Sequence, residues 1–213
     1  VVRELVILAV DLSCIHYFWI PGALLLQVMY AIGVSMVLMI LLRRLPTPVV
    51  GLLALATLVG IEFLIPEQIV VPFEAGPAAR ALLMGVGWID LPNSWGAPFG
   101  PTGSTHGIFA AYPVLPWCAM MGLGWVFGRY LLRSAAASSR APSPFKVLLP
   151  VGLISLIAFA VLRGLNGFGN LGLLRLDHSW VQWLHVSKYP PSLTFTTLEL
   201  GVMALILAVF FWW

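Results

Sequence analysis

Apolar residues gather in six long runs that are separated by shorter and more polar stretches. Each run is close to the roughly 20 apolar residues that an α-helix needs to cross about 30 Å of hydrocarbon. The pattern predicts an all-α fold: a polytopic transmembrane helix bundle of about six spans, forming a single domain over residues 1–213. The chain lacks an initial methionine and its last residues are apolar, so we expect it to be part of a longer protein. The runs cover residues 3–20, 22–43, 48–65, 108–132, 146–163 and 190–213.

Two stretches between the runs have a composition of their own. Residues 66–107 mix proline and glycine with Trp88 and Trp95, and the apolar stretch near 78–89 is too short for a span. We predict that 66–107 is an extracytoplasmic or re-entrant loop, long and irregular, with an interfacial helix. Residues 133–146 are rich in serine, alanine and proline and have no apolar face to bury, which predicts a flexible cytoplasmic linker.

Composition and charge narrow the class of protein. Hydrophobic residues make up 61% of the chain and charged residues only 9%, whereas a soluble domain has about 25% charged residues. Basic residues gather after the second run, at Arg43 and Arg44, and around residues 129–146, and the positive-inside rule places these loops in the cytoplasm. We therefore expect a multi-pass protein of the bacterial inner membrane, with the lipid bilayer as its partner. The net charge of +3 follows from that topology and gives no argument for nucleic acid.

Cysteine usage and residue spacing point away from a metal centre. Cys14 and Cys118 both fall in predicted spans, where a free thiol is usually a small packing residue. The sequence shows no metal-ligand spacing, so we predict neither a metal site nor a permanently bound cofactor. Gly124 and Gly128 form a G-x-x-x-G spacing that allows two helices to approach closely. Oligomeric state is not defined by the sequence, and a homo-oligomer remains open.

Two predicted helices begin with aromatic residues and prolines. Proline in the first turn costs no helical hydrogen bond and presets φ, so Pro190 and Pro191 mark the start of the last helix. "FAAYPVLPWCAM" (109–120) begins the fourth predicted helix in the same way. We expect both helix heads to face the outer side and to share one cavity. Its predicted lining residues are Tyr112 and Trp117 at the head, with Asp11 and Glu199 near the membrane midplane.

The start of the last helix also has the chemistry of an anion site. A helix N-terminus offers free N–H groups and the positive end of the dipole, and Ser192 can form a hydrogen bond there. Lys188 would add a positive charge next to it. The same residues could instead anchor the helix at the membrane interface, as lysine and tyrosine commonly do.

Four strings in this order resemble bacterial membrane proteins related to the heparan-alpha-glucosaminide N-acetyltransferase catalytic domain. The resemblance runs from about residue 1 to 210 and is poorest over 66–107. It implies a multi-helix membrane protein that transfers an acyl group from acyl-CoA, as co-substrate, to a sugar or glycan acceptor. The strings are "LLQVMYAIGVSMVLMILLRRLP" (25–46), "AYPVLPW" (111–117), "VLRGLNGFGN" (161–170) and "VSKYPPSL" (186–193).

The resemblance also assigns residues. The phosphates of acyl-CoA need fixed cations and polar donors, and the matching positions are Arg163, Asn166, Lys188, Tyr189 and Ser192. Acyl transfer needs a base, and the histidines on the outer side are His106, His178 and His185.

This sequence departs from the family pattern at two points. The family's helix with an Asp-His pair is expected to precede the first residue of this sequence, and the role of that pair is not transferred to Asp177 and His178. His185 also stands where the family has asparagine.

Two other functions remain open. In a transporter or channel component, Asp11 and Glu199 would form a proton relay, and the interrupted heads of two helices would frame the pathway. In a non-catalytic membrane scaffold, the polar loops would bind a partner protein.

Overall fold

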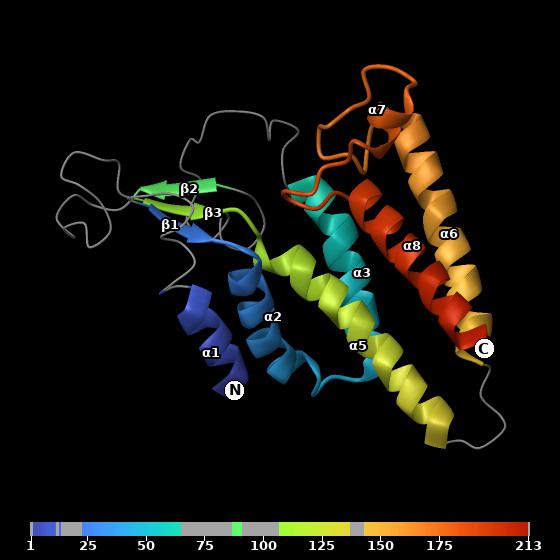
Figure 1. Ribbon diagram of the computed structural model, residues 1–213, viewed down its shortest axis with the longest axis horizontal. Helices are drawn as coiled ribbons and strands as arrows, with labels where there is room; N and C mark the ends of the chain where they lie inside the picture. The colour runs from blue at the N-terminus through green and yellow to red at the C-terminus, as the bar shows by residue number, and fades with distance from the viewer. Residues whose placement is uncertain are drawn as a thin grey trace.

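The computed structural model describes residues 2–11, 13, 23–64, 87–90, 107–136 and 143–212. Helices dominate these residues, and three short strands accompany them (Figure 1). The elements, in chain order, are α1 (Val2–Val10), β1 (Ala23–Leu26), α2 (Val28–Leu42), α3 (Thr47–Leu64), β2 (Gly87–Asp90), β3 (Gly107–Ala110), α5 (Val114–Ala136), α6 (Pro144–Leu165), α7 (Trp180–Leu184) and α8 (Leu193–Trp212).

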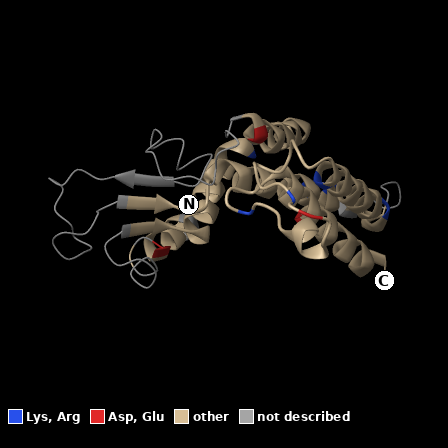
Figure 2. Cartoon of the chain, turned by 90° about the horizontal axis from the view of Figure 1, so that it is seen from above, with Lys and Arg blue, Asp and Glu red and all other residues tan. Residues whose placement is uncertain are grey.

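The long helices lie side by side, and successive helices from α2 to α8, apart from the short α7, run in opposite directions (Figure 1). One end of the molecule carries the strands and the α6–α8 connection, residues 166–192, which includes α7. The opposite end carries the N-terminus, the C-terminus and the α2–α3 turn with Arg43 and Arg44. Seen from above, charged residues are sparse on the ribbon (Figure 2).

Two helices, α6 and α8, are long and apolar enough to cross a membrane. The six predicted spans are not confirmed. Residues 23–26 form β1, so the helix in the second run keeps only the 15 residues of α2, about 22 Å at 1.5 Å per residue. α3 is also short, and α5 carries Arg129 and Arg133 in its second half. The first run is an α-helix only over α1 within its described part.

The predominance of helices agrees with the predicted fold, but a small three-stranded sheet shows that the described residues are not all-α. β3 lies between β1, which is parallel to it, and β2, which is antiparallel. Residues 87–89, expected in an interfacial helix, belong to β2, which ends at Asp90. Residues 66–86 and 91–106 lie outside the described residues. Four-residue apolar segments such as "ALLL" have no periodicity that separates a strand from part of a helix. Pairing with distant segments decides, and Leu25 and Leu26 are buried in β1.

The predicted linker 133–146 is also shorter than expected. Residues 133–136 continue α5, and α6 already begins at Pro144, where proline fits the first helical turn. Residues 137–142 lie outside the described part of the chain.

Glycines set two close helix contacts, but not at the predicted pair. A Cβ atom on Gly152 would lie 2.6 Å from Leu205 Cδ2, and one on Gly201 would lie 2.9 Å from Leu156 Cδ2, so α6 and α8 cross closely. α3 packs on α5 through Ala54, Leu58 and Ala119. Around Gly124 and Gly128, in contrast, a Cβ atom would meet open space, so their spacing does not mark a contact here.

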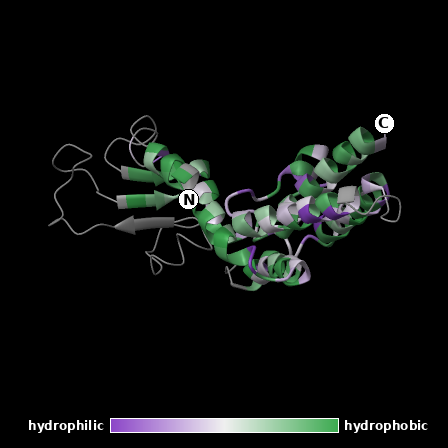
Figure 3. Ribbon diagram, turned by 90° about the horizontal axis from the view of Figure 1, so that it is seen from below, coloured by the Kyte–Doolittle hydropathy of each residue, from purple (hydrophilic) through white to green (hydrophobic). Residues whose placement is uncertain are grey.

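The outer surface of the helices is apolar. Leu52, Ile154 and Phe210 are among the large side chains that are more than half exposed. Hydrophobic colours cover most of the helical ribbon (Figure 3). Soluble proteins rarely expose apolar patches this extensive. Together with the two candidate spans, this surface indicates association with a membrane.

Candidate functional site

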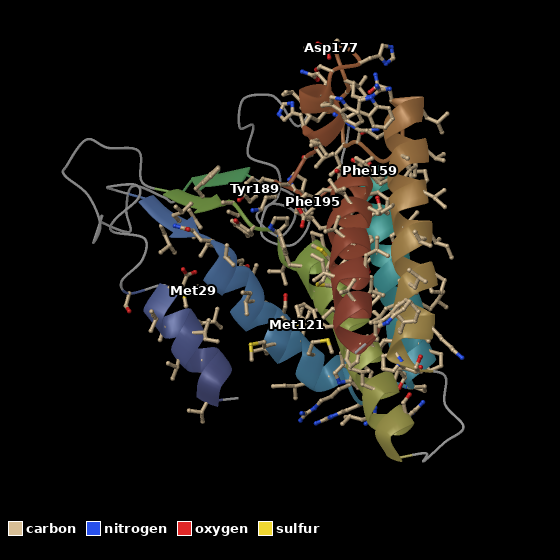
Figure 4. The ribbon with its side chains drawn as sticks, turned by 45° about the vertical axis from the view of Figure 1, so that its right-hand side comes forward. Met29, Met121, Phe159, Asp177, Tyr189 and Phe195 are labelled. Atoms are coloured by element: carbon tan, nitrogen blue, oxygen red, sulfur yellow. The ribbon has the colours of Figure 1, made fainter. Side chains whose placement is uncertain are left out.

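The heads of α5 and α8 meet through two tyrosines. The hydroxyl oxygens of Tyr112 and Tyr189 are 2.6 Å apart, and their rings meet edge to face with centroids 4.8 Å apart. Tyr189 is labelled beside the start of α5 in Figure 4. The expected closeness of the two proline-marked helix heads is therefore confirmed. The cavity between them stays a prediction.

An aromatic row continues from this contact into the helices. The rings of Tyr112 and Trp117 have centroids 5.4 Å apart, and Trp117 and Phe195 follow at 6.3 Å. The indole N–H of Trp117 is buried and has no hydrogen-bond partner among the described residues. Lys188 is exposed, with its Nζ 5.3 Å from the centre of the Tyr189 ring. We call Tyr112, Trp117, Lys188 and Tyr189 the tyrosine mouth.

The two tyrosines of the mouth differ in acidity. Burial and the bond to Tyr189 raise the pKa of Tyr112 to about 12. The same bond, helped by Lys188, lowers the pKa of Tyr189, because a hydrogen bond from the Tyr112 hydroxyl stabilises the phenolate form of Tyr189. Tyr189 is therefore the first of the pair to release its proton as pH rises. The mouth offers a hydroxyl of lowered pKa beside an exposed ammonium group.

Arg163, in the last turn of α6, donates hydrogen bonds to several residues of the α6–α8 connection. It is fully buried, and every N–H of its guanidinium donates to a protein oxygen. Among the described residues its acceptors are neutral oxygens. They are Asn170 Oδ1 at 2.6 Å and the carbonyls of Leu173 at 2.7 Å, Gln182 at 2.6 Å, Trp183 at 3.3 Å and His185 at 2.6 Å.

These five hydrogen bonds occupy every donor of Arg163. A phosphate could reach its donors only by displacing bonds that order the connection. The structure thus gives Arg163 a scaffolding role, and its predicted contact with acyl-CoA stays a prediction.

Asn166 and Arg175 complete the same scaffold. Asn166 ends α6 in the left-handed conformation, with φ 53°, and exchanges two hydrogen bonds with the backbone of Arg175 at 2.6 and 3.0 Å. The Arg175 guanidinium donates to the carbonyls of Arg163 and Gly164, the free acceptors at the end of α6. Asn166 is therefore occupied locally, and its predicted contact with acyl-CoA also stays a prediction.

The N-terminus of α8 is an anion site that the protein itself fills. The carboxylate of Glu62, from α3, accepts the Leu193 N–H at 2.6 Å and the Leu171 N–H at 3.2 Å. Ser192 caps the helix as expected, since its hydroxyl accepts the Phe195 N–H at 3.1 Å, and its side chain is buried. The backbone N–H of Thr194 donates to Gly169, and that of Thr196 to Ser192. The first turn has no N–H left for a phosphate.

The histidines are placed differently. His185 is exposed on the segment that leads to the mouth, and its carbonyl accepts from Arg163. His178 Nδ1 lies 3.3 Å from the Arg175 guanidinium. Asp177 accepts the Ser179 N–H at 2.7 Å, and its bonds to Ser179 lower its pKa. Asp177 and His178 thus have separate hydrogen-bond partners, Ser179 and Arg175. His106 lies outside the described residues.

Asp11 and Glu199 are far apart in the fold. Asp11 is buried at the end of α1, which packs on α2, whereas Glu199 is exposed on α8, which packs on α6. α1 and α8 lie at opposite sides of the molecule (Figure 1). Their predicted place in a cavity is not tested, but this separation gives no support to a direct relay between them.

Sequence reasoning missed Glu62 as the partner of α8. The only sign in the sequence was a carboxyl at the end of an apolar run, which cannot be told from a solvent-exposed surface carboxyl.

No group of three His, Cys, Asp or Glu residues that could hold a metal occurs in the described part of the chain. Comparison of the chain with protein-family models, with curated proteins and with solved structures finds no match in any of the three.

Proposed function

We propose that the chain is a membrane acyltransferase domain that moves an acyl group from acyl-CoA to a sugar or glycan acceptor at the tyrosine mouth. The proposal follows the resemblance to bacterial membrane proteins related to the heparan-alpha-glucosaminide N-acetyltransferase catalytic domain. The observation that carries it is the 2.6 Å contact between the hydroxyls of Tyr112 and Tyr189 beside the exposed Lys188. That contact joins two of the four strings on which the resemblance rests.

A third string supports the same place. "VLRGLNGFGN" contains Arg163, which binds the His185 carbonyl, and Asn170, whose Oδ1 lies 3.5 Å from the Thr194 hydroxyl. Residues separated by many positions in the chain therefore gather at one end of the helices. This gathering supports a shared functional site at that end.

The chemistry assigns different tasks to the mouth residues. The acceptor oxygen or nitrogen attacks the thioester carbonyl carbon, the C–S bond breaks, and coenzyme A leaves as the thiolate. The acceptor proton passes to a base, for which His185 is the exposed histidine nearest in sequence to the mouth. Lys188 supplies positive charge for a CoA phosphate, and Tyr189 supplies a polarised hydroxyl that orients the acceptor.

The experiment uses the protein in nanodiscs with radiolabelled acetyl-CoA and a panel of amino sugars and glycans. We expect label to move to one acceptor class, and Lys188→Ala and Tyr189→Phe to reduce the transfer. Lys146→Ala is the matched control, because Lys146 is an exposed lysine at the opposite end of α6. Absence of both acyl-CoA binding and transfer would reject the proposal. Equal activity in Lys188→Ala and Lys146→Ala would remove Lys188 from it.

A further inference from the structure

The α6–α8 connection exposes large apolar side chains around its short helix. Leu176 is 88% exposed, Trp180 84%, Val181 75% and Leu184 59%. We call these four residues the α7 surface. Apolar side chains of this size are costly to leave exposed to water. A cluster of them on one short helix indicates that something other than water covers it.

The backbone and the Gln182 side chain of the same helix make hydrogen bonds within the connection. Arg163 binds the carbonyls of Gln182 and Trp183, and the Gln182 side chain accepts the Leu176 N–H at 3.3 Å. Ser179 caps α7 by accepting the Gln182 N–H. Polar groups inside and apolar groups outside are the reverse of a soluble loop. The α7 surface therefore does not result from poor packing, because the bonds beneath it hold it outward.

Packing of Trp183 against α6 places α7 beside the C-terminal end of that helix. A Cβ atom on Gly164 would lie 3.7 Å from Trp183 Cη2, and the rings of Phe159 and Trp183 have centroids 6.5 Å apart. Trp183 thus lies beside the last two turns of α6, and Figure 4 shows Phe159 on α6 below the connection. Gly164 lies between Val161 and Leu165, which are exposed apolar residues of α6. The α7 surface continues the apolar exterior of that helix.

The length of α6 fixes where this level falls in a bilayer. The 22 residues of α6 span about 33 Å, close to the thickness of the hydrocarbon core. If α6 crosses the bilayer, its last turns and the adjacent α7 lie where hydrocarbon meets headgroups. Tryptophan favours this zone because it has an apolar body and one N–H donor. Arg175, 4.4 Å from the Trp183 ring, provides a cation at the same level.

We propose that the α7 surface inserts into the headgroup boundary of the phospholipid bilayer that α6 crosses, and so anchors the α6–α8 connection at the membrane surface. The inference rests on the membrane embedding assumed in the proposed function, but not on acyl transfer. Arg163 joins α7 to His185, three residues before Lys188. An anchored α7 therefore also holds the tyrosine mouth at the membrane surface.

Depth-dependent fluorescence quenching tests this directly. Single cysteines replace Trp180 or Leu184 on the α7 surface, Asp177 as the aqueous control, and Ile157 on the exposed face of α6 as the hydrocarbon control, in a chain with Cys14→Ser and Cys118→Ser. Each is labelled with a polarity-sensitive dye. The protein is reconstituted in vesicles of phosphatidylcholine and phosphatidylglycerol that carry nitroxides at shallow or deep acyl positions.

We expect dyes at positions 180 and 184 to emit at shorter wavelength than the dye at 177 and to be quenched most by shallow nitroxides. An interfacial helix lies roughly 5–10 Å into the headgroup boundary. The dye at position 157 is expected to be quenched most by deep nitroxides.

If the dye at 157 is quenched in this way but the dyes at 180 and 184 behave like the dye at 177, the membrane anchor is wrong although α6 still spans the bilayer. If 180 and 184 are shielded from both lipid and aqueous quenchers, a protein surface covers them, and the lipid proposal fails. If 157 does not respond to lipid nitroxides, the embedding itself fails.

Discussion

Two neighbouring regions at one end of the molecule use similar residues in different ways. The first, which we call the Arg163 floor, consists of Arg163, Asn166, Asn170, Arg175, Glu62 and Ser192. There almost every described donor has an acceptor inside the protein. The tyrosine mouth has one hydroxyl contact, an exposed lysine and an indole N–H without a described partner. A buried or exposed cation with polar neighbours can therefore belong either to a structural scaffold or to a binding site. Whether its hydrogen-bond donors are already used within the protein distinguishes the two.

The largest expected effect comes from removing the centre of the floor. Arg163→Met leaves several buried carbonyls without donors, and we expect unfolding in nanodiscs to become easier by about 3–5 kcal/mol. Arg129→Met is the control, because Arg129 is exposed on α5 and lies over the Trp125 ring. Denaturant unfolding followed by tryptophan fluorescence measures both. Equal stability of the two variants would contradict the scaffolding role of Arg163.

The helix crossing below the floor is the next test. In Gly201→Ala the new Cβ would lie 2.9 Å from Leu156 Cδ2 and 3.1 Å from Ser155 Cβ, so α6 and α8 must separate. We expect a loss of about 1–3 kcal/mol, typical of overpacking. Gly124→Ala on α5 meets open space and should show only the gain in helix propensity. Thermal melting of the pair separates the two effects, and a stabilised Gly201→Ala would show that the crossing is loose.

Glu62 connects α3 to the floor, and its replacement should have a moderate effect. Glu62→Gln keeps the shape but removes the negative charge that faces the first turn of α8. We expect a loss of about 1 kcal/mol, the usual size of a helix-terminal interaction. Glu199→Gln is the control, since Glu199 is an exposed carboxyl on α8, beyond the first turn that Glu62 contacts. Hydrogen exchange at the Leu193 and Leu171 amides should rise in Glu62→Gln alone, and unchanged protection would argue against this bond.

The smallest expected effect on stability comes from a change in the tyrosine mouth, where the pKa of Tyr189 is the quantity that should shift. In Tyr112→Phe the hydrogen bond that lowers the pKa of Tyr189 is lost, so the pKa of Tyr189 should rise while stability stays within about 0.5 kcal/mol. Tyrosinate absorbance as a function of pH, with Tyr189→Phe to identify the signal, measures this shift. Tyr130→Phe, far down α5, should leave the Tyr189 titration as it is. A Tyr189 titration unchanged by Tyr112→Phe would show that the hydroxyls do not interact in solution.

The sequence predicted those features that depend on local chemistry. Pro113 and Pro190 lie close before α5 and α8 because proline restricts its own backbone, but the prediction that Pro190 and Pro191 form the first turn of the last helix is wrong, since α8 begins at Leu193. The capping role of Ser192 follows from its hydroxyl. The features that it missed depend on distant partners. The carboxylate on Leu193 comes from Glu62, more than a hundred residues earlier. Apart from Asn170 Oδ1, the acceptors of Arg163 are backbone carbonyls, which have no sequence signature. The strand of residues 23–26 was missed for the same reason, because its partner is β3.

The central position of β3 sets an order of assembly during synthesis. β1 and β2 hydrogen-bond to β3 and not to each other in the described sheet. Both outer strands therefore lack their sheet partner until residues 107–110 are synthesised, which happens after α2 and α3 have been synthesised. A nascent chain stalled before Gly107 would carry two unpaired strands, which are templates for wrong pairing.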